Sequence, residues 1–517
     1  MKTYNIMEFA IGMLLPFILL AQGENWIYRY NGPGDSTDEI RSTIYGADGN
    51  IYIAGGSIGD STYYDFIVIS LSNTGDTNWV YRYNGPGNSD DIATSVVYGA
   101  DGNIYAAGGS CGSGTDWDFI VISLTTTGDT NWVYRYNGPE NDIDCAYAID
   151  YGADGNIYAA GGSYQTYYNS DLTVISLTTT GNANWIFCYD GPGNSTDIAR
   201  CIKYYVRSFP HICAAGLSMG DMTYYDGVII DLSTSGDTNW VYRYNGPGND
   251  PDEILSLDIG ADRNIYVAGY SGGMGTSYDF LVISMDTYVW GLPRWIFTYN
   301  GQGNGFDIAY SVVYGADSNI YAAGYTYNSA FSADLTVISL KDNGDTNWVY
   351  RYNGSGDYNA WASSIIYGAD GNIYAAGGSY DTGTLSDITV LSLTTSGNAN
   401  WVYRYNGPGN GDDEALSIIR DPNGNVYAVG NSYGFGTGLD IIVISLPPDY
   451  GVEEENNTVL KTSYGATILS GPLRLPKNKK YKIFDITGRI AMSDRLKPGV
   501  YFIQIDNKII QKIVKIR

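Results

Sequence analysis

The sequence predicts an all-β fold, an eight-bladed β-propeller followed by a small β-sandwich. Tryptophans recur at steps of 53 or 55 residues, each opening a version of the phrase NWVYRYNGPG: Trp26, Trp79, Trp132, Trp185, Trp240, Trp295, Trp348 and Trp401. A period near 50 residues, made of short strands, is typical of a ring of β-sheets. The composition agrees, because 66 Gly and 50 Tyr accompany runs of Val, Ile and Thr. No long stretch has the 3.6-residue apolar period of a helix.

Residues 1–21 have the pattern of a secretory signal peptide. Lys2 gives a positive start, residues 9–20 form an apolar core, and Ala21 precedes a plausible cleavage point before Gln22. The apolar run is short for a membrane span. An uncleaved anchor is the alternative, but the flanks favour cleavage, which leaves no transmembrane anchor in the mature protein.

One repeat, residues 91–138, predicts the strands of a blade. Residues 91–98, 104–109, 118–124 and 132–136 alternate apolar and polar side chains, and turn sequences separate them. In the turn between the first two strands, Gly102 and Asn103 suit a positive φ. Ala and Gly in the second strand are expected to permit close approach of neighbouring sheets. Four antiparallel strands in about 53 residues make one propeller blade.

The phase of the repeat predicts how the ring closes. After signal cleavage the chain begins with a fourth strand, residues 26–30, and the last repeat ends with a third strand, residues 440–446. The last repeat therefore lacks an outer strand, which the first strand can supply. Such closure removes exposed sheet edges. We expect the propeller to span residues 24–446.

Two resemblances support this architecture. The run SVVYGADGNIYAAGGS, followed by DFIVISLTTTGDTNWVYRYNGPG, resembles the bacterial SBBP-type β-propeller repeat, over roughly residues 24–446. The spacing of Thr127, Gly128 and Trp132 also resembles the tryptophan-docking motif of eight-bladed quinoprotein dehydrogenases. That motif carries an acidic residue where this chain has Leu124 or Leu177, and the cysteine pair expected beside the quinone is missing. The second resemblance implies the blade packing and not the cofactor.

The remainder of the chain is a different module. Residues 447–458, with their Pro-Pro start and acidic run, are typical of an exposed linker. Residues 459–517 resemble the C-terminal sorting (Por) domain of type IX secretion cargo, through Gly488, Arg489, Gly499, Tyr501, Lys512 and Lys515. That resemblance implies a small Ig-like β-sandwich recognised by the type IX machinery, and a secreted or cell-surface protein exported through the periplasm of a Gram-negative-type bacterium. A plain Ig-like end domain is the alternative.

The charge of the chain is large and uneven. The net charge is −27, from 28 Lys+Arg and 55 Asp+Glu. Residues 459–517 hold 13 Lys+Arg and 3 Asp+Glu, which leaves 15 and 52 in residues 1–458, so the body carries about −37 and the tail about +10. A body this acidic is repelled by phosphate backbones, so we expect no nucleic-acid partner.

One side of the predicted ring carries the sequence variation. The loops between second and third strands differ from copy to copy, as in residues 58–65, 110–118 and 163–171, and they share a side with the acidic connections between blades. We call this side the variable face. Loops on a rigid scaffold often carry function, and exposed aromatic rings beside carboxylates suit glycan or protein ligands. The candidate ligand-binding residues are Tyr63, Tyr64, Trp117, Tyr167, Tyr168, Tyr224, Tyr225, Tyr278 and Trp361. Packing of these rings between neighbouring loops is the alternative.

Two columns of aspartates point to the same face. One begins the first strand of seven copies: Asp38, Asp91, Asp144, Asp197, Asp252, Asp307 and Asp413, with Ala360 breaking it. The other begins all eight third strands: Asp65, Asp118, Asp171, Asp226, Asp279, Asp334, Asp387 and Asp440. Repetition in every blade favours acceptance of backbone N–H bonds at turns. Calcium held by clustered carboxylates, with Asp91 and Asp118 as candidates, is the open alternative. No other cofactor is expected.

Catalytic signals are weak. The only histidine, His211, has no recognisable nucleophile partner, and the sequence contains no G-x-S-x-G, phosphate loop or H-E-x-x-H. Cys201 and Cys213 lie within reach of one hairpin, so a disulfide there stays open. The sequence therefore favours a binding module for a glycan or protein. The alternatives are an extracellular enzyme, either a hydrolase or lyase or a quinoprotein-like protein, and a purely structural surface protein.

Overall fold

The computed structural model describes residues 23–450 except 167–168, 288–290, 330–331, 355–357, 382 and 449, together with five strands between residues 467 and 515. The chain divides into two compact units, residues 1–451 and 452–517, and each is described by itself. The predicted signal peptide and most of the predicted linker lie outside the described residues. Within the described part, no helix is long and apolar enough to cross a bilayer.

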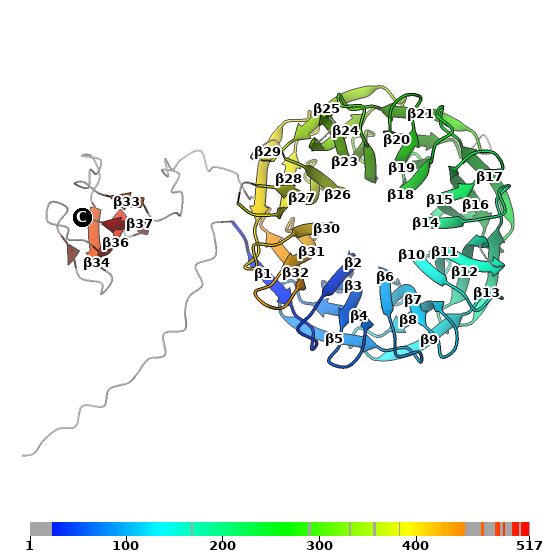
Figure 1. Cartoon of the computed structure of the whole chain (residues 1–517), viewed down its shortest axis with the longest axis horizontal. Coiled ribbons are helices and arrows are strands. Elements are labelled where there is room, and N and C mark those ends of the chain that lie inside the picture. The colour runs from blue at the N-terminus through cyan, green and yellow to red at the C-terminus, as the bar shows by residue number, and fades with distance from the viewer. Residues whose placement is uncertain are drawn as a thin grey trace, which may run out of the picture. The chain divides into compact units, whose positions relative to one another are not determined.

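The first unit is a ring of eight four-stranded antiparallel sheets, which confirms the predicted eight-bladed propeller. In Figure 1 the first strand of each sheet lies nearest the centre and the fourth at the rim. Blades 1 to 4 are β2 (Asp38–Tyr45), β3 (Ile51–Ile58), β4 (Tyr64–Leu71), β5 (Thr77–Tyr83); β6 (Asp91–Tyr98), β7 (Ile104–Cys111), β8 (Trp117–Leu124), β9 (Thr130–Tyr136); β10 (Asp144–Tyr151), β11 (Asn156–Thr166), β12 (Asn169–Thr178), β13 (Ala183–Tyr189); and β14 (Asp197–Val206), β15 (Pro210–Met219), β16 (Tyr225–Ser233), β17 (Thr238–Tyr244). Blades 5 to 8 are β18 (Glu253–Ile259), β19 (Ile265–Gly272), β20 (Tyr278–Met285), β21 (Pro293–Tyr299); β22 (Ile308–Tyr314), β23 (Ile320–Ser329), β24 (Ser332–Leu340), β25 (Thr346–Tyr352); β26 (Ala360–Tyr367), β27 (Ile373–Tyr380), β28 (Ser386–Leu393), β29 (Ala399–Tyr405); and β30 (Asp413–Arg420), β31 (Val426–Tyr433), β32 (Leu439–Leu446) with β1 (Trp26–Tyr30).

Blade 8 is assembled from both ends of the repeat array. β1 pairs antiparallel with β32, so that Trp26 lies opposite Ser445. This blade has no turn between its third and fourth strands, and Tyr450 packs beside the seam instead, with its ring 4.9 Å from that of Trp401. The Tyr403 hydroxyl donates to Glu24 Oε1 at 2.6 Å. Side chains from both ends of the array therefore cover the joint.

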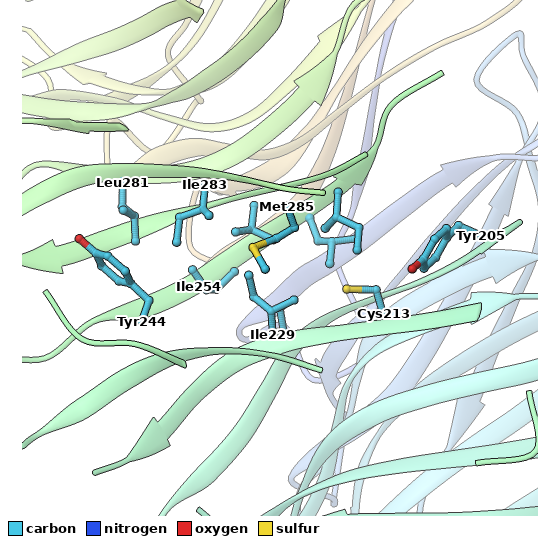
Figure 2. Close-up of a cluster of buried hydrophobic side chains, with 12 residues drawn as sticks. Tyr205, Cys213, Ile229, Tyr244, Ile254, Leu281, Ile283 and Met285 are labelled. Carbon is cyan, nitrogen blue, oxygen red and sulfur yellow. The ribbon is translucent and has the colours of Figure 1, made fainter. Parts of the chain in front are cut away.

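The core lies between blades, and the second and third strands are buried on both faces. In β3 seven of eight residues are buried, which explains its continuous apolar sequence. Figure 2 shows the contact between blades 4 and 5, where Ile229 of β16 meets Ile254 of β18 and Met285 of β20. Each blade thus presents one face to each neighbour.

The small residues of the second strands allow close approach between neighbouring sheets, as predicted, and also within a blade. A Cβ on Gly56 of β3 would lie 3.2 Å from Ile92 Cγ1 of β6 in the next blade. A Cβ on Gly55 of β3 would collide with the carbonyl oxygen of Glu39 in β2 of the same sheet. The register of β2 against β3 shifts between Ile40 and Ser42. This bulge pushes the Glu39 carbonyl towards β3, which leaves no room for a side chain.

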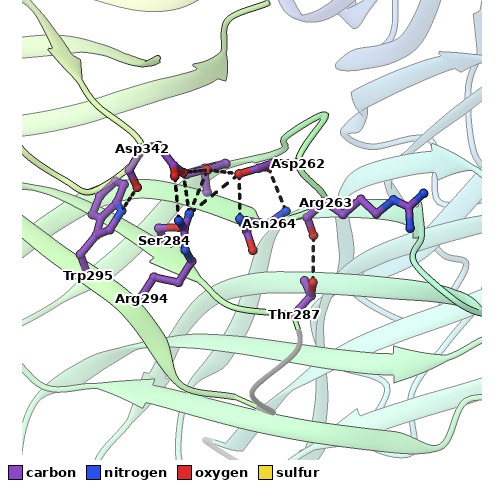
Figure 3. Close-up of polar contacts among 9 residues, drawn as sticks. Asp262, Arg263, Asn264, Ser284, Thr287, Arg294, Trp295 and Asp342 are labelled. Atoms are coloured by element: carbon purple, nitrogen blue, oxygen red, sulfur yellow. Dashed lines mark hydrogen bonds and ion pairs between the residues drawn. The ribbon is translucent and has the colours of Figure 1, made fainter. Parts of the chain in front are cut away.

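The repeat tryptophan docks on the next blade around the ring. The indole N–H of Trp79 donates to the carbonyl oxygen of Thr126 at 2.8 Å. Its ring covers Gly128, where a Cβ would lie only 2.7 Å from Trp79 Cδ2. Figure 3 shows the same arrangement between blades 5 and 6, where Trp295 donates to the Asp342 carbonyl at 2.7 Å. There Arg294 also holds both carboxylate oxygens of Asp342, at 2.8 and 3.0 Å.

The turn between first and second strands depends on one glycine and one aspartate. Gly102 has a φ of 84°, as predicted, whereas Asn103 does not take a positive φ. Asp101 explains the difference, because its Oδ1 accepts the N–H of Asn103 at 3.1 Å in an Asx-type turn. The other oxygen accepts the Tyr105 hydroxyl at 2.6 Å, which links the turn to the buried second strand.

The second unit contains one mixed sheet in its described part. Its strand order is β33 (Thr467–Leu469), β37 (Lys508–Lys515), β36 (Gly499–Ile505), β34 (Tyr481–Asp485) and β35 (Ile490–Ala491). β33 and β37 are parallel, and the other pairs are antiparallel. The sandwich stays a prediction. Of the proposed sorting residues, Gly499 and Tyr501 lie in β36, Lys512 and Lys515 lie in β37, and Gly488 and Arg489 lie outside the described residues.

Candidate binding site

The variable face is held together by hydrogen bonds between its two sets of loops. The N–H of Gly34, before blade 1, donates to the carbonyl of Ile58, the last residue of β3 before the loop, at 3.2 Å. The same bond joins Gly87 to Cys111 in blade 2, at 3.1 Å. The connections between blades and the loops between second and third strands therefore form one continuous surface around the central channel.

A cavity of about 550 Å³ opens at the central channel, and we call it the central pocket. Its lining comes mainly from the innermost strands of blades 1 to 5, which Figure 1 shows facing the middle of the ring. The lining residues are Arg41, Ile92, Thr94, Trp117, Ile143, Cys145, Tyr147, Arg200 and Leu255. A concave, largely apolar cavity with a few polar groups is the usual form of a small-ligand site.

The first strands place these side chains by their alternation. In β2, Asp38 and Ile40 are buried, whereas Glu39 and Arg41 point away from the core. Counted from the aspartate, or from Ala360 in blade 7, the second and fourth residues of each copy therefore face the channel. These pairs are Glu39 and Arg41, Ile92 and Thr94, Cys145 and Tyr147, Ile198 and Arg200, Glu253 and Leu255, Ile308 and Tyr310, Trp361 and Ser363, and Glu414 and Leu416.

The charged groups of the central pocket are paired. Arg200 Nε donates to Glu253 Oε1 at 2.6 Å, and the Tyr270 hydroxyl donates to the other oxygen at 2.7 Å. The Arg200 guanidinium also lies over the ring of Tyr147, 5.1 Å from its centroid. On the other side of the channel, Arg41 donates to Glu39 at 2.6 Å. The pocket thus offers donors and acceptors without an unpaired charge.

Burial shapes the protonation of the channel residues. It raises the pKa of the Tyr147 hydroxyl to about 12, and the neighbouring Cys145 adds to the effect. Burial also raises the pKa of Glu414 above its usual range, and the charge of Asp412 acts in the same direction, against the lowering effect of Arg41. Tyr147 is therefore a neutral hydroxyl at physiological pH, able both to donate and to accept a hydrogen bond.

The predicted aromatic residues do not form one patch. Trp117 lines the central pocket. Trp361 occupies a channel-facing position, with its ring 5.9 Å from that of Tyr380. The Tyr64 hydroxyl donates to Glu39 at 3.2 Å, so this side chain supports a channel residue.

Of the other predicted aromatics, Tyr63 and Tyr224 lie on loops, and Tyr225 and Tyr278 are the first residues of β16 and β20. Tyr63 and Tyr224 are 65% and 59% exposed. Tyr225 is half-buried, and Tyr278 stacks on Tyr270 with centroids 4.5 Å apart. Tyr167 and Tyr168 lie outside the described residues. Some of the predicted aromatic residues therefore face the channel, and others lie at the loops of the variable face.

The aspartate columns have partners from within the protein. Asp91 Oδ2 accepts the N–H of Gly85 at 2.6 Å, and the first-strand aspartates of the other six copies accept the matching glycine N–H. Asp118 forms an ion pair with Arg135 of the fourth strand at 2.5 Å. The first-strand column makes the backbone N–H contacts that the turn interpretation predicts. Asp118 of the second column instead pairs with an arginine of its own blade.

Sequence reasoning missed Arg41, Tyr147, Arg200 and Glu253, because it searched loops and not strands. A signal was present. Across the eight copies, the channel-facing positions read Glu-Arg, Ile-Thr, Cys-Tyr, Ile-Arg, Glu-Leu, Ile-Tyr, Trp-Ser and Glu-Leu, whereas the buried residue between each pair is always Ala or Ile. The channel-facing positions thus differ from copy to copy while the buried position between them stays the same. Such a pattern indicates a surface that varies independently of the fold.

The only histidine and the cysteines do not form a catalytic centre. His211 Nδ1 lies 2.9 Å from the buried carboxylate of Asp231, and its ring stacks on Tyr205. This pair replaces Asn50 and Ser70 of blade 1, which makes it a local variant of a structural contact. All five cysteines are free, so the Cys201–Cys213 disulfide considered from the sequence is absent.

No protein-family model matches the chain, and no curated protein matches its sequence. Among solved structures, the chain is similar to a protein of unknown function from Bacteroides caccae, at 10% identity and a TM-score of 0.31 over 57% of this chain and 93% of that one. It is also similar to a protein of unknown function from Dyadobacter fermentans, at 12% identity and a TM-score of 0.37 over 58% and 93%. A eukaryotic initiation factor gives 9% identity and a TM-score of 0.41 over 77% and 84%. At these scores the similarities say nothing of what the chain binds.

Proposed function

We propose that this chain is a secreted or cell-surface binding module, and that the central pocket holds a segment of an extracellular glycan. The observation that carries the proposal is the composition of the pocket. Trp117 and Tyr147 bring aromatic side chains to the lining, and the Arg200–Glu253 pair offers donors and acceptors beside them. Sugars present apolar ring faces ringed by hydroxyls, and such a surface matches both kinds of group.

The paired charges favour a neutral glycan over a charged ligand. Each pocket arginine already has a carboxylate partner, at 2.6 Å in both cases. An ionic ligand would have to displace one of these partners, and breaking such a pair leaves an uncompensated charge. The hydroxyl groups of a neutral glycan can instead hydrogen-bond to the remaining N–H groups and lone pairs of the two Arg–Glu ion pairs.

The proposed route of export rests on the two ends of the chain. The N-terminal signal-like segment and the sorting-like residues of the second unit support passage through the periplasm by the type IX machinery. The SBBP-type resemblance of the repeat fits a bacterial surface protein. Export is tested separately, by locating the full-length and tail-deleted chains in culture supernatant, cell-surface and periplasmic fractions.

A glycan array probed with the full chain tests the binding proposal, followed by affinity measurement on the best glycan. Trp117→Ala should weaken binding about tenfold or more, as expected for an aromatic anchor in a pocket. Phe209→Ala is the control, because this ring is 74% exposed in the turn between β14 and β15, away from the variable face. Binding that ignores Trp117, or an array without any bound glycan, would contradict the proposal. If the chain instead captures a protein, and that capture is lost when Tyr63 and Tyr224 are replaced, the glycan proposal would give way to protein recognition.

A further inference from the structure

Most blades carry their own cation on the variable face. The third residue after the repeat tryptophan is arginine in six copies: Arg29, Arg82, Arg135, Arg243, Arg351 and Arg404. In blade 2, Arg135 binds Asp118 at 2.5 Å, the Ser110 hydroxyl at 2.6 Å and the Ser110 carbonyl at 3.0 Å. The same ion pair recurs in blades 1, 4, 7 and 8. The guanidinium thus fills a slot between carboxylate, hydroxyl and carbonyl groups.

Blade 3 has lost this cation and gained an acid. Cys188 stands where the arginine would be. Two residues later, Asp190 stands where the other seven copies have asparagine. In blade 2 the set of Asp118, Arg135, Asn137 and Asp144 carries a net charge of −1, and the matching set in blade 3 carries −3 with a neutral thiol. Blade 5 also lacks the arginine, through Thr298, but keeps Asn300.

Three carboxylates converge at Asp171, the aspartate whose arginine partner is missing in blade 3. Asp171 of β12, Asp190 of the connection and Asp197 of β14 each contribute an oxygen to a group whose members lie within 4.8 Å of one another. Asp171 is 8% exposed and Asp197 is fully buried, and the Oδ1 of each has no hydrogen-bond partner. Unpartnered Oδ1 atoms also occur in other blades. Asp118 has Arg135 beside it, and Asp279 of blade 5 lacks a guanidinium but has Asn300 where Asp190 adds a third carboxylate in blade 3.

Asp171 also lacks the second partner of its column. In six copies a threonine stands three residues before the third-strand aspartate, and in blade 4 Thr223 Oγ1 donates to Asp226 Oδ1 at 2.9 Å. Blade 3 has Tyr168 at that position. The charge of Arg243 acts on Asp197, although the ion pair of Arg243 is with Asp226, at 2.7 Å. Asp171 has no such arginine, because Cys188 stands at that position in its own blade.

We propose that Asp171, Asp190 and Asp197 bind a calcium ion, which supplies the positive charge that the arginine gives to the third-strand aspartate in other blades and joins blade 3 to blade 4. Ca²⁺ prefers carboxylate oxygens at about 2.3–2.6 Å, so ligands on opposite sides of one ion lie up to about 5 Å apart. The three oxygens satisfy that limit. Asp190 is exposed, which leaves room for the water ligands that complete the coordination shell.

Calcium titration of the EDTA-dialysed full chain, by calorimetry and by the shift in melting temperature, tests this site. We expect one ion with a Kd of about 0.1–1 mM, in the range of extracellular calcium modules, and a higher melting temperature at 10 mM CaCl₂. Asp190→Asn and Cys188→Arg each restore the residue of other copies, so both should fold and both should weaken calcium binding at least tenfold. Cys188→Arg should also raise the melting temperature in EDTA.

Asn137→Asp is the matched control, because it adds the same carboxylate in blade 2 while Arg135 still fills the slot. This variant should bind no second calcium ion. A wild-type chain that shows no calcium binding up to 10 mM, or binding that survives Asp190→Asn, would overturn the proposal. Zinc binding that is lost in Cys188→Ser, without calcium binding, would assign the site to a thiolate metal instead. None of these outcomes depends on the glycan proposal.

Discussion

Two glycines of blade 2 allow the docking of a tryptophan to be separated from backbone strain. Gly102 and Gly128 have φ values of 84° and 85°. A Cβ at Gly102 would lie no closer than 3.9 Å to any other group, whereas one at Gly128 would lie 2.7 Å from the Trp79 ring. Alanine at the two positions therefore incurs the same conformational strain but meets different surroundings.

The expected cost of each substitution follows from these surroundings. A side chain in the left-handed region costs about 1–2 kcal/mol, of which about 0.4–1 kcal/mol is offset by the lower entropy of the unfolded chain. Gly102→Ala should thus destabilise the propeller by about 1 kcal/mol. Gly128→Ala also displaces Trp79, which adds about 1–3 kcal/mol of overpacking and about 1 kcal/mol for the indole hydrogen bond. We expect Gly128→Ala to cost about 2–4 kcal/mol more than Gly102→Ala.

Urea denaturation followed by tryptophan fluorescence measures the difference. Blade 3 offers an independent pair, because Gly155 and Gly181 both have φ 82° and only Gly181 lies under a tryptophan, Trp132. Equal free energies of unfolding for the two variants of a pair, within about 0.5 kcal/mol, would refute the view that indole docking holds adjacent blades together.

Two further predictions concern the seam and the buried carboxylates. Tyr450→Ala should lower the free energy of unfolding by about 2–3 kcal/mol, because it removes a half-buried ring from Trp401 and Tyr403, and Tyr433→Ala, which removes a 40% exposed ring, should cost less in the same urea assay. The pKa values of Asp38, Asp252 and Asp307 are raised to about 6, chiefly by burial. The folded chain therefore binds protons more tightly than the unfolded chain, so in EDTA the urea midpoint should rise as the pH falls from 7 to 5, and a lower midpoint at pH 5 would contradict this reasoning.

The fold was predictable because its determinants are local and repeated. The position of Trp79, the turn at Gly102 and the alternation of β2 all follow from sequence periods. The collision that fixes Gly55 was not predictable, because it depends on a bulge in the paired strand. The central pocket was missed for a related reason: Arg41, Tyr147 and Arg200 come from three blades, and only ring closure brings them to one channel. Asp171 was placed in a structural column, and its lack of partners became apparent only when each copy was compared with its neighbours in space.

The pairing of β1 with β32 in blade 8 also determines when the propeller ring can close. Trp26 meets Ser445, 419 positions later, so a ribosome must release nearly the entire repeat array before the circle can close. Until then β1 has no partner, because β32 is the last strand of the array to be made. Contacts of such sequence separation are slow to form. A chain that crosses a membrane unfolded would benefit from late closure, because the closed ring cannot form before the last strand of the array has been made.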